Sequence, residues 1–158
     1  MNLEQLLQFL KDDGRFMANV TAWVEIPARE AAYAEFPNSI DLRLREALLR
    51  RGVTRLYSHQ AAAIREIEDG RNVVVVTPTA SGKTLCYNLP VLNSIIKHRE
   101  SRAIYLFPTK ALSQDQKVEL QNLIEQIGEP IRTHTYDGDT SSDARQAIRT
   151  QGDIVITN

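Results

Sequence analysis

The sequence predicts an α/β fold in which a parallel β-sheet is covered by helices on both faces. Beyond Gly52, short apolar strands alternate with helical patterns, as βαβ units require. The first of these strands contains "VVVV" at 73–76, which is apolar at every position, as expected of a central strand buried on both faces. A chain of 158 residues, 42% of them hydrophobic, is long enough for one compact domain.

The first 52 residues are expected to form a mostly helical extension ahead of the sheet. A leucine stripe at helical spacing ends at Gly14 and comprises Leu3, Leu6, Leu7 and Leu10. An irregular, proline-containing stretch around Trp23 follows. A second helix, closed by Gly52, is then indicated by Leu42, Leu44, Leu48 and Leu49.

Residues 53–158 are expected to form the sheet and its helices. Strands are predicted at 72–76, 103–107, 131–136 and 153–157. Helices are predicted at about 58–69, 83–98, 110–127 and 140–150. Ligands of an open α/β sheet bind beyond the carboxyl ends of its strands. We therefore expect the loops that follow the four strands to lie along one edge and to carry the functional residues.

Composition and charge exclude several classes of protein. With 19 basic and 20 acidic residues the formal net charge is −1, so any surface that binds nucleic acid must be local. The single cysteine, Cys86, rules out an internal disulfide. The N-terminus lacks the basic and apolar regions of a signal peptide, and no stretch has the length of a membrane span. We expect a soluble, cytoplasmic protein with no membrane partner.

A phosphate-binding loop is predicted after the valine strand, in "TPTASGKT" at residues 77–84. Gly82, Lys83 and Thr84 match the Walker A spacing, in which glycine admits the phosphates, lysine reaches the β- and γ-phosphates and the hydroxyl ligates Mg²⁺. Backbone amides at the start of the next helix also favour anions. The alternative is an ordinary strand–turn–helix with a chance Gly-Lys-Thr. The residues expected around the nucleotide are Thr79, Ala80, Ser81, Gly82, Lys83, Thr84 and Leu85, with Lys83 and Thr84 in catalytic roles.

A residue that reads the base is predicted upstream, in "RLYSHQAAAI" at residues 55–64. Gln60 precedes Lys83 by 23 positions, and a glutamine amide can accept from N6 and donate to N7 of adenine. The same geometry would select ATP over GTP. Leu56 or Tyr57 is expected to pack on the adenine ring. The alternative for Gln60 is a solvated helix cap.

The order of the motifs resembles that of superfamily 2 DEAD/H-box helicases. "LYSHQ", "TPTASGKT", "LFPTKALSQDQ", "TYDGDT" and "DIVITN" are similar to the Q motif, motif I, motif Ia, the glycine motif and the start of motif Ib. Thr77 replaces the usual first glycine of motif I, and some helicase loops accept a small residue there. "NVTAWVEIPAREAAYAEFP" also resembles bacterial mitomycin repair factor helicases, which translocate 3′ to 5′ on DNA. The resemblance implies a RecA-like P-loop NTPase sheet, here an incomplete first lobe at 53–158 after the extension at 1–52.

The resemblance also implies a nucleic-acid contact at the strand ends. Hydroxyl groups, ammonium groups and helix N-termini bind phosphate without reading the base sequence. The residues so implied are Pro108, Thr109, Lys110, Gln114, Gly138, Thr157 and Asn158. Without the other motifs, residues 108–110 would simply be a proline-capped strand end leading into a surface helix. Asp137 and Asp139 are expected to cap the helix at 140–150.

The activity that the resemblance implies is ATP-dependent DNA unwinding in repair, with ATP and Mg²⁺ as cofactors and single-stranded or 3′-tailed duplex DNA as partner. No expected strand is followed by the Asp–Glu pair that the family uses to hold Mg²⁺ and to orient water. The second lobe, with its arginine finger, is also missing. We therefore expect a fragment that does not hydrolyse ATP by itself. Two alternatives stay open, a non-catalytic nucleotide- or nucleic-acid-binding module and an RNA helicase.

Overall fold

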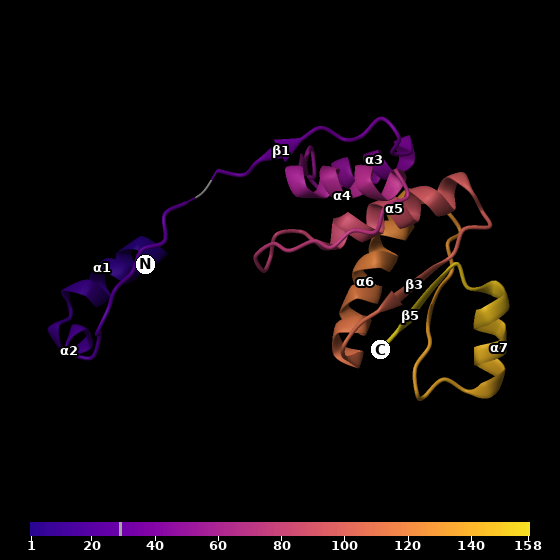
Figure 1. Ribbon diagram of the computed structural model, residues 1–158. Coiled ribbons are helices and arrows are strands. Elements are labelled where there is room, and N and C mark those ends of the chain that lie inside the picture. Colours follow the sequence, from indigo (N-terminus) through magenta and orange to yellow (C-terminus); the bar gives the residue numbers. More distant parts are fainter. Residues whose placement is uncertain (29) are drawn as a thin grey trace. The chain divides into compact units, whose positions relative to one another are not determined.

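The computed structural model describes residues 1–28 and 30–158, and it contains two compact units, Met1–Ala31 and Ala32–Asn158 (Figure 1). The first unit consists of α1 (Leu3–Asp12) and α2 (Gly14–Met17). Asn2 begins α1 through a capping box, because its side chain accepts from the Gln5 N–H at 2.9 Å while the Gln5 side chain accepts from the Asn2 N–H at 3.1 Å. The predicted N-terminal leucine helix is confirmed.

The second unit begins with β1 (Tyr33–Ala34), α3 (Leu42–Arg50), β2 (Leu56–Tyr57) and α4 (Ser58–Glu68). β1 pairs antiparallel with β2, with Tyr33 opposite Tyr57. The predicted second leucine helix is confirmed as α3, and its Leu44 and Leu48 are fully buried in the core. Within the described residues, no helix is both long enough and apolar enough to cross a membrane.

The remaining elements of the second unit form the sheet and its main helices. They follow the predicted alternation with small shifts at their ends. In chain order they are α5 (Thr84–Lys97), β3 (Ala103–Leu106), α6 (Lys110–Ile127), β4 (Thr133–Thr135), α7 (Ser142–Gln151) and β5 (Ile154–Thr157).

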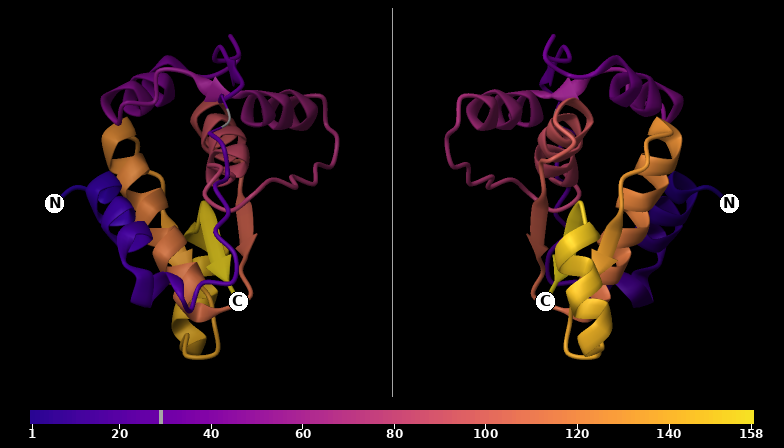
Figure 2. Two further views of the ribbon diagram at one scale, coloured as in Figure 1. Left: turned by 90° about the vertical axis from the view of Figure 1, so that its left-hand side faces the viewer. Right: turned by 90° about the vertical axis from the view of Figure 1, so that its right-hand side faces the viewer.

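The sheet is parallel and has the strand order β3–β5–β4. The chain crosses from β3 to β4 through α6 and returns to β5 through α7. The two crossovers run in opposite directions, and crossovers of this kind are right-handed, so α6 and α7 must lie on opposite faces of the sheet. Figures 1 and 2 show the strands between these helices. The predicted parallel sheet with helices on both faces is confirmed.

Burial alternates along β5 and identifies the core face. Ile154 and Ile156 have no exposed surface and pack with α6 residues such as Leu123, whereas Val155 and Thr157 are only partly buried. Successive side chains of a strand point to opposite faces. The face covered by α6 therefore belongs to the main core, and the face covered by α7 is more open.

The predicted strand at 72–76 is wrong. In the part of the chain that the structure describes, no strand pairs with this segment. Val74 and Val76 are 90% and 89% exposed, whereas Val73 and Val75 are partly buried. An all-apolar strand is buried on both faces only when neighbouring strands hold it inside a sheet. Because this segment lacks such neighbours among the described residues, the side chains of Val74 and Val76 remain exposed to solvent.

Candidate nucleotide and nucleic-acid site

The phosphate loop, residues 77–84, leads from the valine segment into α5. Its backbone is left-handed at Ala80 and Gly82, with φ values of 60° and 72°. Glycine is needed at the second position, because a Cβ there would lie 2.6 Å from Gln60 Nε2. α5 begins at Thr84, directly after this turn. A left-handed turn that enters the N-terminus of a helix is a backbone geometry that binds phosphate.

The ammonium group of Lys83 folds back on this loop. Its Nζ donates to the backbone carbonyls of Thr77 at 2.8 Å and Pro78 at 2.7 Å, and to Ser81 Oγ at 3.4 Å. The Thr77 and Ser81 hydroxyls are 2.6 Å apart and close the loop from the other side. Phosphate oxygens are stronger acceptors for an ammonium group than neutral carbonyls. The loop therefore holds its lysine in contacts that a triphosphate can replace.

Gln60 links the start of α4 to the phosphate loop. Its Nε2 donates to the Gly82 carbonyl at 2.8 Å, and its Oε1 accepts from the Tyr57 backbone N–H at 2.8 Å. The side chain is 2% exposed, so it is not a solvated cap. Both the oxygen and the nitrogen of the amide are hydrogen-bonded within the protein. Gln60 can therefore bind a base only if one of these hydrogen bonds is broken.

The aromatic ring beside the loop is that of Tyr57. This residue is 37% exposed, and its ring stacks on Tyr33 with centroids 5.4 Å apart and on His59 with centroids 5.7 Å apart. Leu56 has no exposed surface and lies in the core, so it is not available to pack on a base. Of the two candidates for the adenine contact, only Tyr57 offers an accessible ring.

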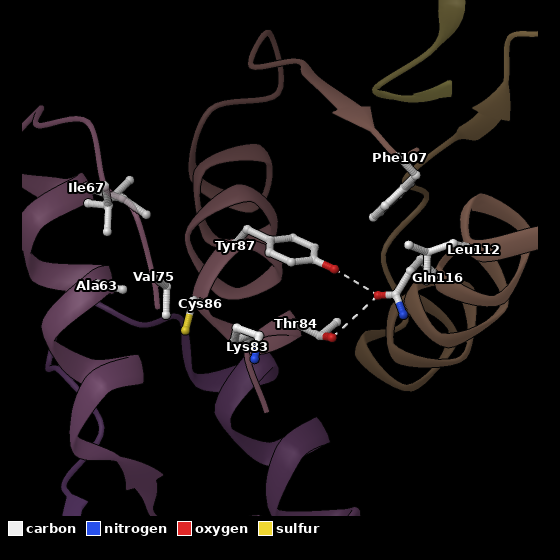
Figure 3. A pocket seen from close by; sticks show the side chains of 11 residues that line it. Ala63, Ile67, Val75, Lys83, Thr84, Cys86, Tyr87, Phe107, Leu112 and Gln116 are labelled. Carbon is white, nitrogen blue, oxygen red and sulfur yellow. Dashed lines mark hydrogen bonds between the residues drawn. The ribbon is translucent and has the colours of Figure 1, made fainter. Parts of the chain in front are cut away.

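Thr84 lines a cavity of about 440 Å³ between α4, α5 and the start of α6 (Figure 3). On the far wall, Gln116 of α6 accepts two hydrogen bonds through Oε1. The Tyr87 hydroxyl donates one at 2.8 Å and the Thr84 hydroxyl donates the other at 3.4 Å. The thiol of Cys86, which also lines the cavity, is buried, and burial raises its pKa.

The residues present fit a magnesium ion that arrives with a nucleotide. Mg²⁺ is usually held by few protein oxygens together with substrate phosphates and water, and the Thr84 hydroxyl is an oxygen of this kind beside the phosphate loop. Within residues 1–28 and 30–158, no group of three or more His, Cys, Asp or Glu side chains is placed to hold a metal alone. Such an ion would neutralise charge on the phosphates and would depend on them for binding.

The loops that follow β3 and β4 meet the C-terminal end of β5 at one edge of the sheet, as predicted for three of the four expected strands. The Phe107 N–H donates to the Thr157 carbonyl at 3.0 Å, and the Tyr136 N–H donates to the Ile156 carbonyl at 2.8 Å. Thr109 caps α6 by accepting from the Leu112 N–H at 3.2 Å. The predicted contacts on this edge are exposed at Pro108, Thr109, Lys110, Gln114, Gly138 and Asn158, and Thr157 is partly buried.

A salt bridge joins the first residue of α6 to the loop after β4. Lys110 Nζ donates to Asp139 Oδ2 at 2.5 Å, and this hydrogen bond and the negative charge raise the pKa of Lys110. The predicted capping of the next helix by Asp137 and Asp139 is wrong. α7 begins two positions later than expected, at Ser142, and its cap is Ser141, which accepts from the Ala144 N–H at 3.4 Å.

Three features of the site could not be predicted from the sequence. They are the stacking of Tyr33 on Tyr57, the pairing of Asp139 with Lys110, and the contact of Gln116 with Thr84. Each joins residues far apart in the chain, and no local pattern selects them. Gln116 ends the "LFPTKALSQDQ" motif and Asp139 lies in "TYDGDT", but the motifs do not indicate these contacts.

Comparison with known proteins agrees with this geometry. The family model described as DEAD/DEAH box helicase matches residues 57–158. The uncharacterized ATP-dependent helicase YprA of Bacillus subtilis is 52% identical over 157 residues, which are 99% of this chain and 20% of that protein. The ATP-dependent helicase hrq1 of Schizosaccharomyces pombe is 35% identical over 162 residues, which cover 99% of this chain and 15% of that protein. The chain thus spans a fifth or less of these relatives.

Solved structures give the same result. The crystal structure of the DUF1998 helicase MrfA bound to DNA and AMPPNP superimposes with a TM-score of 0.90 at 52% identity, over 100% of this chain and 22% of that one. The structure of MrfA bound to DNA gives a TM-score of 0.89. The Mycobacterium smegmatis helicase Lhr, bound to ssDNA and AMP-PNP, has a TM-score of 0.66 at 27% identity, over 76% of this chain and 17% of that one.

Proposed function

Because the chain belongs to the DEAD/DEAH box helicase family, we propose that it is the ATP- and DNA-binding part of an ATP-dependent DNA helicase. One observation carries the proposal: a left-handed turn at Gly82 leads Lys83 and Thr84 into the N-terminus of α5. Residues 53–158 would form the first part of the ATP-binding domain, preceded by an extension at 1–52. The resemblance to mitomycin repair factor helicases extends the proposal to DNA repair and to 3′–5′ movement.

In this proposal the nucleotide binds across the phosphate loop. Lys83 leaves the Thr77 and Pro78 carbonyls and pairs with the β- and γ-phosphates, and the Thr84 hydroxyl ligates Mg²⁺. Gln60 and Tyr57 face the base, which favours adenine. The phosphates are surrounded by the loop residues Thr79, Ala80, Ser81, Gly82, Lys83, Thr84 and Leu85.

DNA binds at the sheet edge formed by the loops after β3 and β4 and by the C-terminal end of β5. The Thr109 hydroxyl and the Lys110 ammonium group lie at the N-terminus of α6, where phosphate is favoured by charge and by free backbone amides. Such contacts are independent of base sequence and suit single-stranded or 3′-tailed DNA. The remaining proposed contacts are Pro108, Gln114, Gly138, Thr157 and Asn158. The 52% identity to MrfA, a helicase solved with DNA and AMPPNP, supports both ligands.

A binding experiment tests this proposal. The 158-residue chain is titrated with a fluorescent ATP analogue and Mg²⁺, and separately with labelled single-stranded DNA and RNA of the same sequence. We expect saturable nucleotide binding that is lost in Lys83→Ala and weakened in Gln60→Ala, and we expect binding to DNA. If a chain shown by circular dichroism to be folded binds neither ligand, the proposed function is wrong. Preference for RNA would favour an RNA helicase instead.

A further inference from the structure

We propose that Gln116 is a positioning residue, which orients the Thr84 hydroxyl so that its oxygen faces the Mg²⁺ of a bound nucleotide. The inference rests on the proposed function, because it concerns the same phosphate loop. Gln116 lies on α6, whereas Thr84 begins α5, 32 positions earlier in the chain. The two side chains meet at the wall of the cavity in Figure 3.

The direction of the hydrogen bonds supports this role. An amide oxygen only accepts, so both hydroxyls that contact Gln116 Oε1 must donate their protons to it. The Thr84 proton therefore points toward α6, and the lone pairs of its oxygen are left for another partner. A cation needs an oxygen ligand in this state. Groups that orient a metal ligand from outside commonly change metal affinity roughly tenfold to hundredfold.

The Gln116 amide is itself held in place by Tyr87. The contact from the Tyr87 hydroxyl is the shorter of the two, at 2.8 Å. The Tyr87 ring packs edge-on against Tyr105, with centroids 5.3 Å apart, and the Tyr105 hydroxyl donates to Asn88 Oδ1 at 2.9 Å. Tyr87 thus fixes the amide from one side, and the amide fixes Thr84 from the other.

The test measures how much Mg²⁺ strengthens nucleotide binding. A fluorescent ATP analogue is titrated into the 158-residue chain with Mg²⁺ and again with EDTA. We expect Gln116→Leu to lose most of the Mg²⁺-dependent gain, roughly tenfold in Kd, with the EDTA affinity unchanged. Gln116→Glu retains the acceptor oxygen, so Mg²⁺ should strengthen its nucleotide binding at least as much as in the wild type. Gln121→Leu is the matched control, because Gln121 also lies on α6 but donates to Thr133 Oγ1 at 3.2 Å.

The possible outcomes separate this inference from the proposed function. If the folded wild-type chain binds no nucleotide, the proposed function itself fails. If the wild type binds with a gain from Mg²⁺ and Gln116→Leu shows the same gain, only the inference is wrong. If Gln116→Leu loses nucleotide affinity equally with Mg²⁺ and with EDTA, Gln116 has only a structural role and the inference is also wrong. Should Gln116→Leu unfold, Gln116→Asn is used instead, because its amide is one carbon too short to reach Thr84.

Discussion

Gln60 Nε2 and the Gly82 carbonyl oxygen are 2.8 Å apart and form a hydrogen bond between the start of α4 and the phosphate loop. The bond spans 22 positions of the chain and involves a side chain that is almost completely buried. Because the other end of the same amide holds the Tyr57 N–H, any movement of Gln60 toward a base must also alter the loop. If Gln60 binds the base as proposed, base recognition and phosphate binding are coupled through this hydrogen bond.

Replacement of Gln60 by alanine should weaken nucleotide binding and reduce the preference for ATP over GTP. The variant loses both the base contact and the support of Gly82. An amide pairing of this kind contributes about 1–3 kcal/mol to discrimination between bases, which corresponds to roughly fivefold to 150-fold in relative affinity. Titrations with fluorescent ATP and GTP analogues measure the change, with Gln121→Ala on α6 as control. An unchanged ATP/GTP ratio would show that Gln60 only supports the loop.

Replacement of Lys83 by alanine should weaken binding of ATP much more than binding of adenosine. The ammonium group contacts only backbone carbonyls and the Ser81 hydroxyl in the described structure, and it is the cation that the triphosphate would take over. A hydrogen bond to a charged group contributes about 1.5–3 kcal/mol, or roughly tenfold to 150-fold in Kd. Competition of each ligand against a fluorescent analogue measures the effect. Equal losses for ATP and adenosine would contradict a phosphate role.

Replacement of Asp139 by asparagine should strengthen DNA binding a few-fold at low salt. Asp139 neutralises Lys110 on the edge proposed for the DNA backbone, and a phosphate must compete with its carboxylate. In the complementary variant Lys110→Ala, affinity should fall for every DNA sequence, and the slope of log K against log salt should decrease by about one. Fluorescence anisotropy over a range of salt concentrations measures both variants. If Asp139→Asn weakens binding, the salt bridge instead orients Lys110 for phosphate.

Local signals explain why most of the second unit could be predicted. α6 has the predicted limits, because the residues that begin and end it are encoded beside it. Thr109 caps its first turn, and Gly128, with φ of 75°, ends its last. The phosphate loop was predictable for the same reason, since its glycine, lysine and threonine are consecutive.

Features that depend on distant partners could not be predicted. The valine segment at 72–76 has the composition of a buried strand, but composition cannot supply the neighbours that would bury Val74 and Val76. Asp139 pairs with Lys110 and does not cap α7, although its position in the sequence suggested a helix cap. The role of Gln116 could not be predicted, because its contact with Thr84 exists only once α6 lies beside α5.

Replacement of Asp153 by asparagine should lower stability at neutral pH and have little effect in acid. Burial opposes ionisation of Asp153, but three hydrogen bonds from Arg132, at 2.8 to 3.1 Å, lower the pKa of the carboxyl group overall. A lowered pKa stabilises the fold above the ordinary aspartate value near 3.9, and this contribution disappears as the pH falls through the folded pKa. Because the Arg132 side chain is half exposed, we expect a loss of only about 1–2 kcal/mol at pH 7.

Urea unfolding of the wild type and of Asp153→Asn at pH 7, 5 and 3 measures this difference. Asp115→Asn is a suitable control, because Asp115 is exposed on α6 and lies beyond its first turn. A difference between wild type and Asp153→Asn that persists unchanged at pH 3 would show that the charge of Asp153 is unimportant and that only its shape and hydrogen bonds matter.

The 158-residue chain should bind ATP without hydrolysing it at a measurable rate. In the proposed site Thr84 would supply one oxygen to Mg²⁺, but the expected strands are not followed by an Asp–Glu pair that would complete the metal shell and orient the attacking water. Release of phosphate with and without single-stranded DNA, compared with the Lys83→Ala variant, tests this. Turnover that DNA stimulates and that Lys83→Ala abolishes would contradict this prediction and would show that these residues already contain a complete catalytic site.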